Sequence, residues 1–382
     1  MEYSKIGDIC LKVCSGGTPN SSNPNYYNGG IPWLNTNEVN FCNIYSTNKT
    51  ISQEGLEHSA AKYVPSNTVV VAMYGVTAGK SAIAKIPLTT NQACCNLVID
   101  AAKADYRYVY YFLKQQSDNL NKLANGGAQQ NLNSLIIKKY KIALPELPIQ
   151  HRIASILSTY DTLIENNTKR IRLLEKMAEN LYKEWFVRFR FPGHENVEME
   201  NGLPKGWKIE RVKSCVKRLN FGLTYKESEV EQEGKVIVID QSSKEFLGYH
   251  NGTPSHSANL DKPILLFGDH SCKFKLMIQD FSLGENVIPF ISKDDSRLDC
   301  YYLFYSTHKL IKTEEYKRHW GKFVSMKMIL PNFDLQMKFS RLVKGVEKVK
   351  DNLQKQNSLL AHQRDLLLPR LMSGKLEVKM KS

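Results

Sequence analysis

The sequence predicts an α+β protein with two globular α/β domains separated by a pair of long helices, which form an antiparallel coiled coil. Two observations carry this prediction. Apolar residues recur in steps of four and three along two separate segments, and these segments are copies of one another within an internal repeat. The expected boundaries are a first globular domain over 1–148, a first long helix over 149–190, a linker and second globular domain over 191–334, and a second long helix with a basic tail over 335–382.

The two helical segments follow the same heptad pattern. Steps of four and three residues alternate from position 149 to 181, and again from 335 to 367, so that every counterpart lies 186 residues further along without a gap. We therefore expect the helices to pack through one apolar seam. Its members include Ile153, Ile156, Leu163, Leu174, Leu181, Phe339, Leu342, Val349, Leu360 and Leu367.

Two polar residues, Asn167 and Arg170, interrupt this seam in the first helix. A buried polar residue in a coiled coil can fix the register and orientation of two helices at some cost in stability. Alternatively, the seam loosens there and both side chains face the solvent. The sequence leaves both interpretations open.

The globular domains differ in length, whereas the helices do not. Counterparts lie 206 residues apart at the start of the domains, as Gly16 and Gly222 do, and 193 apart further on, as Lys80 and Lys273 do. Because the offset falls to 186 in the helices, we infer a duplication that kept the helices constant and varied the domains.

Short elements within the domains can also be placed. Apolar and β-branched runs at 68–72 and 236–239 predict strands, and aromatic segments at 105–117 and 299–311 predict helices. The stretch 191–206 is polar and contains several Pro and Gly residues, as is typical of a linker.

Composition points to a polyanionic partner. The chain has 382 residues and a net charge of +14, which favours nucleic acid or an anionic membrane. No apolar run approaches the ~18 residues needed to span a bilayer, and the N-terminus does not resemble a signal peptide. Eight scattered cysteines without a C-x-x-C spacing favour reduced thiols. We therefore expect a cytoplasmic protein that does not bind membranes.

No catalytic motif is complete in this sequence. The segment 75–81 is one residue short of the phosphate-binding motif G-x-x-x-x-G-K-[ST], and its counterpart at 268–273 lacks the second glycine. A Pro-Pro pair, which the base-holding loop of an adenine methyltransferase would contain, does not occur. The histidines, among them His250 and His256, have no metal-ligand spacing. We expect no catalytic residue, no metal and a simple loop between two strands at 73–80.

Six short motifs, taken together in this order, resemble those of the DNA-specificity subunits of type I restriction-modification systems, over nearly the whole chain. They are Gly-Gly-Thr-Pro at 16–19, Gly-Gly-Ile-Pro-Trp-Leu at 29–34, the Gly-rich run at 126–132, Leu-Pro-Glu-Leu-Pro-Ile-Gln at 144–150, Leu-Pro-Lys-Gly-Trp at 203–207, and the segment 366–376. The second domain departs from the pattern, because Gly-Leu-Thr-Tyr stands at 222–225 where the first domain has Gly-Thr-Pro.

The resemblance implies a non-catalytic subunit with two target-recognition domains, each of which reads one half of a split, asymmetric site in double-stranded DNA. Two methyltransferase subunits would dock on it, and restriction and translocation subunits would join the complex. S-adenosylmethionine, ATP and magnesium would be bound by those partners, so no cofactor is expected in this chain.

The helices would then set the distance between the half-sites. They must run antiparallel, because the second domain lies between the end of the first helix and the start of the second. A helix of about 40 residues is roughly 60 Å long. This exceeds one DNA turn of about 34–36 Å.

Polar side chains in two loops are candidates for base contacts. Gln129, Gln130 and Asn131 carry amides that can bond N6 and N7 of adenine, although they could instead satisfy the backbone of their own turn. Asp269 and His270 could contact cytosine N4 or guanine, or could hold a local turn.

The remaining candidates are expected at the backbone of the DNA or beside it. Lys80 and Lys273, which the repeat matches, are predicted phosphate contacts. Further phosphate contacts are predicted at Lys322 and His319, and Thr18 and Tyr74 complete the set, although an aromatic residue such as Tyr74 more often belongs to a core than stacks on a base.

Two other classes of function remain possible from the sequence. A stand-alone nucleic-acid-binding module would bind specifically without a methyltransferase partner. A nucleotide-hydrolysing enzyme would use the incomplete phosphate-binding motif, and would lose nucleotide binding on Lys80→Ala.

Overall fold

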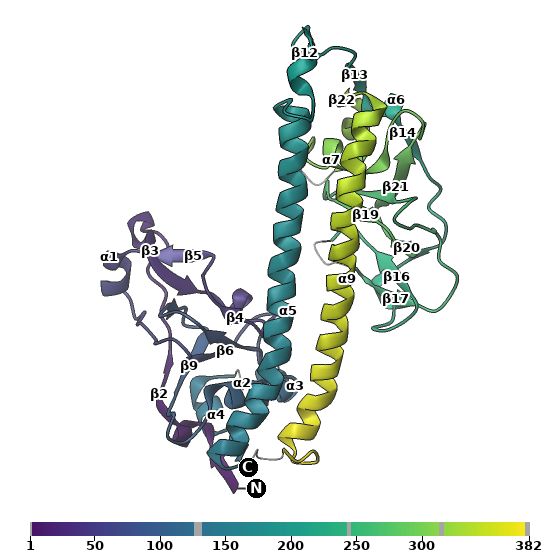
Figure 1. Ribbon diagram of the computed structural model, residues 1–382. Coiled ribbons are helices and arrows are strands. Elements are labelled where there is room, and N and C mark those ends of the chain that lie inside the picture. Colours follow the sequence, from purple (N-terminus) through teal and green to yellow (C-terminus); the bar gives the residue numbers. More distant parts are fainter. Residues whose placement is uncertain (1, 126–131, 243–245, 313–316, 379–382) are drawn as a thin grey trace. The chain divides into compact units, whose positions relative to one another are not determined.

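A computed structural model of the chain describes residues 2–125, 132–242, 246–312 and 317–378 (Figure 1). The chain divides into two compact units. Unit 1 contains residues 1–166 and 356–382, and unit 2 contains residues 167–355. Each unit combines one globular domain with parts of both long helices, and these domains are called head 1 and head 2 below.

Head 1 is built on two sheets, with strand orders β2-β9-β6-β7-β4 and β5-β3-β8. The central strand β6 is buried at all four positions, as a run of consecutive valines favours. The strands are β2 (Cys10–Ser15), β3 (Tyr27–Leu34), β4 (Asn43–Ile44), β5 (Lys49–Ile51), β6 (Val69–Ala72), β7 (Ser81–Ala84), β8 (Thr89–Thr90) and β9 (Cys94–Ile99).

A two-stranded antiparallel ribbon, β1 (Glu2–Lys5) with β10 (Lys141–Leu144), joins head 1 to the first long helix. The aromatic helix α2 (Tyr106–Gln115) packs its rings into the core of unit 1, where Tyr108 and Tyr111 are almost fully buried. The other helical segments are η1 (Ile6–Ile9), η2 (Pro24–Tyr26), η3 (Thr36–Glu38), α1 (Gln53–Glu57), α3 (Ser117–Asn125) and α4 (Ser134–Lys139).

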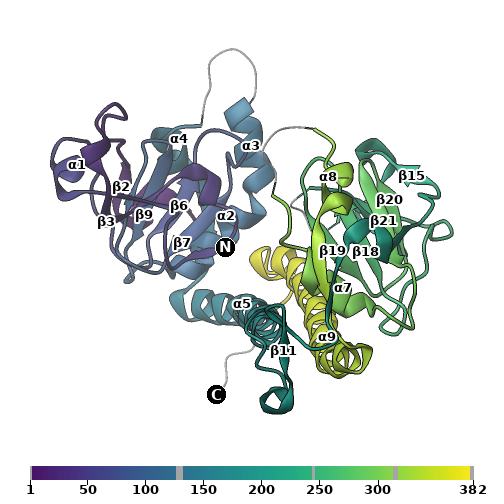
Figure 2. The same ribbon diagram turned by 90° about the horizontal axis from the view of Figure 1, so that it is seen from above.

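Head 2 also has two sheets, with strand orders β14-β21-β18-β19 and β15-β20-β16-β17, and Figure 2 shows β18, β19 and β21 side by side. A ribbon of β13 (Lys208–Arg211) and β22 (Lys327–Leu330) joins it to the second long helix. The other strands are β14 (Val216–Arg218), β15 (Thr224–Tyr225), β16 (Val236–Ile239), β17 (Gly248–His250), β18 (Ile264–Gly268), β19 (Phe274–Met277), β20 (Phe281–Gly284) and β21 (Val287–Ser292). Its helical segments are α6 (Val212–Cys215), η6 (Glu227–Glu229), α7 (Cys300–Thr307) and α8 (Trp320–Ser325).

The two heads share one topology, which confirms the internal repeat. The order β2-β9-β6-β7 corresponds to β14-β21-β18-β19. In the second sheets, β5-β3-β8 corresponds to β17-β16-β20, with one antiparallel and one parallel pair in each, and β15 adds a second parallel pair in head 2. Strand β16 has the predicted bounds, and helices α2 and α7 lie within the predicted aromatic segments. The linker contains η5 (His194–Asn196) and a short hairpin of β11 (Met199–Glu200) and β12 (Leu203–Pro204).

The predicted long helices are α5 (Leu147–Tyr182) and α9 (Phe333–Met372). A π-turn, η4 (Lys183–Val187), extends α5 and buries Trp185 and Phe186. Within unit 1, Asp161 of α5 pairs with Arg364 of α9, and within unit 2, Glu175 of α5 lies 3.2 Å from Lys350 of α9. Early residues of one helix thus meet late residues of the other in each unit, which confirms the antiparallel pairing.

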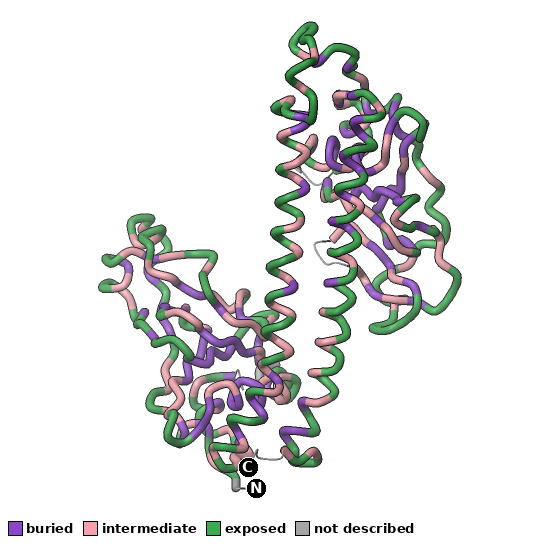
Figure 3. The backbone as a smooth tube through the Cα atoms, in the orientation of Figure 1, coloured by how far each residue is buried: buried purple, intermediate pink, exposed green. Residues whose placement is uncertain are grey.

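The predicted seam is partly wrong. Leu163, Leu342 and Val349 are 45%, 51% and 40% exposed, and Figure 3 shows many other exposed positions on these helices. The reason is that each helix turns its apolar face toward the core of a head: in α9, Val343 joins Phe339 and two further residues of that face. The remaining predicted members are buried or half-buried, namely Ile153, Ile156, Leu174, Leu181, Phe339, Leu360 and Leu367. Asn167 is buried, so its role in the register stays a prediction, whereas Arg170 is exposed and faces the solvent, as the alternative interpretation has it.

One buried glutamine fastens each head to its helix. Gln150 of α5 accepts from the backbone N–H of Asp105 at 3.0 Å and donates to the carbonyl of Pro145 at 2.7 Å. Its counterpart Gln336 of α9 accepts from the N–H of Asp299 at 3.0 Å and donates to the carbonyl of Pro331 at 2.9 Å. These two side chains are called the anchoring glutamines below.

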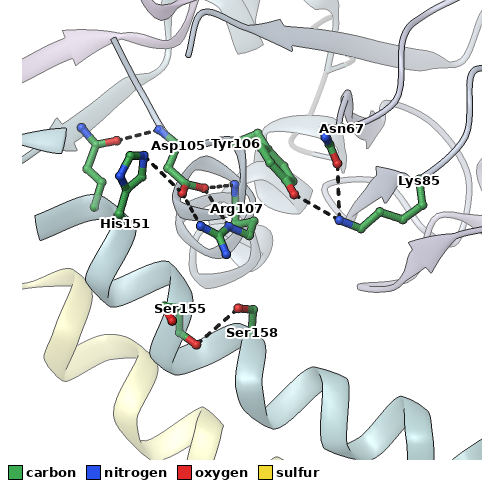
Figure 4. Close-up of polar contacts among 9 residues, drawn as sticks. Asn67, Lys85, Asp105, Tyr106, Arg107, His151, Ser155 and Ser158 are labelled. Carbon is green, nitrogen blue, oxygen red and sulfur yellow. Dashed lines mark hydrogen bonds and ion pairs between the residues drawn. The ribbon is translucent and has the colours of Figure 1, made fainter. Parts of the chain in front are cut away.

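The anchored aspartates also begin the aromatic helices. Figure 4 shows Asp105 at the start of α2 between Arg107 and His151, and its carboxylate lies 2.7 Å from the guanidinium of Arg107. This hydrogen bond, acting against the desolvation of the partly buried guanidinium, raises the pKa of Arg107. Asp105 also caps α2 by accepting from the backbone N–H of Arg107 at 2.7 Å, and Asp299 caps α7 in the same way through the N–H groups of Tyr301 and Tyr302. The duplication has therefore preserved the junction of head and helix in atomic detail.

Candidate nucleic-acid interface

The β6–β7 loop of head 1 is a hairpin connection. Its base is closed because the N–H of Gly79 donates to the carbonyl of Ala72, and the N–H of Ala72 donates to that of Lys80. The Lys80 ammonium lies 2.9 Å from Oδ1 of Asn40, and Tyr74 is 42% exposed. Since the loop joins two antiparallel strands, it lacks the helix N-terminus that cradles a nucleotide phosphate. The predicted loop between strands is confirmed, and its lysine is half-buried, so that Lys80 stays a predicted phosphate contact.

The corresponding β18–β19 loop of head 2 contains Asp269, which has a structural role. Its Oδ1 accepts hydrogen bonds from the backbone N–H groups of His319 at 3.0 Å and Trp320 at 2.9 Å. Asp269 is only 8% exposed and thus caps helix α8 from a distant part of the chain. Of the two alternatives for this residue, the structure favours the local structural role over a base contact.

The neighbouring candidates in head 2 separate into buried and exposed groups. His319 is fully buried, so a phosphate cannot reach its ring and the predicted contact is corrected. His270 is half-buried and its N–H donates to Oε1 of Gln241 at 3.0 Å. Lys273 and Lys322 are exposed and stay predicted phosphate contacts. Sequence position could not reveal the burial of His319, because its backbone is held by Asp269, which lies 50 residues earlier.

A cleft of about 680 Å³ lies beside α8 in head 2. Two arginines, Arg218 of β14 and Arg318, line it together with Trp320 and Asn286. The Arg218 guanidinium lies 4.6 Å from the centroid of the Phe221 ring. Arginines and an aromatic side chain in one open cleft are a chemistry that suits nucleic acid, since guanidinium groups bind phosphates and base edges. These residues were not predicted from the sequence, although the basic pair Lys317-Arg318, close before Trp320, was a usable signal.

The entry motif of head 1 is held by its own contacts. Thr18 is exposed and its hydroxyl donates to the side chain of Gln92, while the indole N–H of Trp33 donates to the carbonyl of Gly17 at 2.9 Å. Gln129, Gln130 and Asn131 lie outside the described residues, so their predicted base contacts stay predictions.

The thiols and the candidate metal ligands of the described residues can be characterised directly. All eight cysteines are free thiols, and burial raises the pKa of Cys94 to about 12, which keeps that thiol protonated near neutral pH. Among the described residues, no group of three His, Cys, Asp or Glu side chains has the geometry of a metal site. No helix within the described ranges combines the length and apolarity that crossing a bilayer requires.

Comparison with known proteins places these features in context. Residues 1–176 match the family described as type I restriction modification DNA specificity domain. The chain is 28% identical to the type I restriction enzyme MjaIX specificity subunit of Methanocaldococcus jannaschii, over 99% of this chain and 94% of the relative. It is also 28% identical to the EcoR124I/EcoR124II specificity subunit of Escherichia coli, over 52% of this chain and 50% of that one.

A solved structure has the same fold. The S subunit of a type I restriction-modification system from M. genitalium superposes with a TM-score of 0.59 at 18% identity, and the match covers 100% of this chain and 96% of the other. At this identity the likeness concerns the fold, including the two heads and the long helices.

Proposed function

We propose that the chain is a DNA-specificity subunit of a type I restriction-modification system, the family that it resembles in sequence and fold, and that it reads a split, asymmetric DNA target with one half assigned to each head. It contributes recognition and no catalysis. The adenine methylation and the cleavage belong to partner subunits, together with their S-adenosylmethionine, ATP and magnesium.

The observation that carries this proposal is the duplication of a constant framework with different surfaces. Both heads share the same core sheet order and an equivalent anchoring glutamine. Their surface loops differ, since the β6–β7 loop spans residues 73–80 and its counterpart spans only 269–273. Two similar folds with different surface side chains are suited to reading two different sequences, because base identity is read by side chains at the groove.

The long helices support the proposed docking of two methyltransferase subunits. Apolar side chains on α5 and α9 stay exposed, among them Leu173 at 67% and Met177 at 53% on α5 and Leu342 on α9. Large exposed apolar residues on a soluble protein favour a protein partner. Because α5 and α9 each begin in one unit and end in the other, we further propose that they set the number of unspecified base pairs between the half-sites.

Sequencing of the methylated bases in cells with and without the gene tests this function. We expect a split, adenine-methylated motif that disappears in the deletion strain and returns on complementation. Persistence of every such motif in the deletion strain would contradict the proposal.

A DNA-binding experiment distinguishes the proposed subunit from a stand-alone binding module. The isolated chain and its complex with the methyltransferase subunits are compared on DNA with and without the motif. Discrimination between the two DNAs should rise sharply in the complex, whereas equal discrimination by the isolated chain would favour the stand-alone module.

A further inference from the structure

The ribbons that join the heads to the long helices carry like charges directly opposite each other. In head 1, Lys5 of β1 pairs with Lys141 of β10. In head 2, Arg211 of β13 pairs with Lys327 of β22 at the matching register position. All four side chains are exposed. Directly opposed residues of an antiparallel pair have Cβ atoms about 4.5–5.5 Å apart, so each pair is repulsive.

No ion pair within the described part of the chain compensates for these charges. Within the described ranges, none of the four forms an ion pair, and the nearby carboxylate of Glu210 binds Arg297 instead. The repulsion is thus an unfavourable electrostatic contribution to stability that no described ion pair offsets, and it occurs in both heads.

The duplication has kept the exposed basic residues of the ribbons at matching positions. The exposed neighbours Tyr3 and Ile209 occupy matching positions but differ in chemistry. By contrast, a positive charge recurs further along the chain, where the exposed Lys12 of β2 matches the exposed Arg218 of β14.

Besides the two opposed ribbon charges and Lys12 or Arg218, each head has a fourth positive charge. The two heads supply this charge from different positions. In head 1, the stem of Lys138 lies so close over Gly7 that a Cβ at this glycine would stand 2.3 Å from Cγ of the lysine. In head 2, the residue that matches Gly7 is itself a lysine, Lys213, and it is exposed. The two heads therefore reach the same charge by different residues, which indicates that the charge matters more than the side chain that carries it.

We propose that these two basic ribbons are phosphate clamps, which bind the DNA backbone and hold each head on the duplex without reading sequence. An anion bound between two opposed basic side chains removes their repulsion, and the ordered phosphates of a duplex supply such anions. The proposal rests on the proposed function and adds to it a division of labour. The ribbons provide affinity, while the loops and the cleft of the heads provide base choice.

The test measures DNA binding by the complex of this chain with its methyltransferase subunits. The first variant is Lys5→Gln/Lys141→Gln and the second is Arg211→Gln/Lys327→Gln. The matched control, Lys49→Gln/Lys62→Gln, removes two exposed charges of head 1 that lie away from the ribbon. The dissociation constant is measured against salt concentration on DNA with the motif and on random DNA.

Each ribbon variant should lower the slope of log affinity against log salt by about 1.8, because each lost phosphate contact contributes about 0.9. The loss should be equal on both DNAs, the methylated motif should stay unchanged, and the unfolding temperature should equal or exceed that of the wild type because the repulsion is gone. A fall in the unfolding temperature would overturn the clamp and indicate a structural role.

Three further outcomes would overturn the proposal. An equal loss of slope in the control would show an effect of net charge alone. A changed motif would make the ribbon residues base readers. An unchanged slope with weaker assembly of the methyltransferase subunits would assign the ribbons to an acidic surface of those partners. If the wild-type complex methylates no split motif, the proposed function fails, and the slope on random DNA still reports on the ribbons separately.

Discussion

Replacing an anchoring glutamine should loosen one unit and leave the other intact. Gln336 is fully buried, and its amide makes three hydrogen bonds, to the N–H of Asp299 at 3.0 Å and to the carbonyls of Pro331 at 2.9 Å and Arg297 at 3.1 Å. In Gln336→Ala all three backbone groups lose this partner, the carbonyl of Pro331 in a buried setting and the other two in partly buried ones. At about 1 kcal/mol for each bond, the variant should lose about 3 kcal/mol of unfolding free energy in unit 2.

Hydrogen–deuterium exchange of the full chain, read by mass spectrometry, localises the effect. Peptides from α7 and β22 should exchange faster in Gln336→Ala, while α2 and β10 keep the wild-type rate. The reverse is expected for Gln150→Ala, whose amide makes the equivalent bonds in unit 1. A control variant, Gln363→Ala, truncates an exposed glutamine of α9 and should change neither unit measurably. Equal acceleration in both units, or none, would refute the view that each head is anchored independently.

Three further predictions concern a cap, a titration and the helices. Asp269→Ala should destabilise unit 2 by about 1–2 kcal/mol in chemical denaturation because α8 loses its cap, whereas Asp269→Asn retains an acceptor oxygen and should cost less; equal losses would argue against the cap. Burial, followed by the charge of Lys309, lowers the pKa of His308 below its unfolded value, so the unfolded chain binds the proton more tightly. The stability of unit 2 should therefore decrease as pH falls below about 6.5, and His308→Asn should flatten that slope; an unchanged slope would exclude His308 as its source. A heptad inserted into both α5 and α9 adds about 10.5 Å of helix and should lengthen the methylated spacer by up to about 3 base pairs; an unchanged spacer would show that the helices do not set it.

Sequence periodicity predicted the helices well and their buried faces less well. The offset of 186 located α5 and α9 because a duplication preserves helix length. Leu342 and Val349 were assigned to a seam between the helices because a heptad pattern does not say what covers it. In the folded chain, the core of head 2 competes for the same helix and buries the face that carries Val343.

The candidate site could be predicted only where exposure follows from the local pattern. Lys273 and Lys322 are exposed, as loop and helix-end lysines usually are. The burial of His319 depends on Asp269, which lies 50 residues earlier and receives the first N–H groups of α8. Long-range pairings of this kind bring Arg218 and Arg318 to one cleft, and no local pattern encodes them.

The central claim is that each head independently reads one half of the target. Its most direct test uses a variant that carries head 1 twice, in which residues 1–144 replace residues 207–330 and both long helices stay intact. The measurement is the methylated motif in cells that express this variant. The account predicts a motif built from two copies of the half-site that head 1 reads, with the half-site of head 2 absent. If the original asymmetric motif persisted in a stable, methylating complex, the assignment of one half-site to each head would be contradicted.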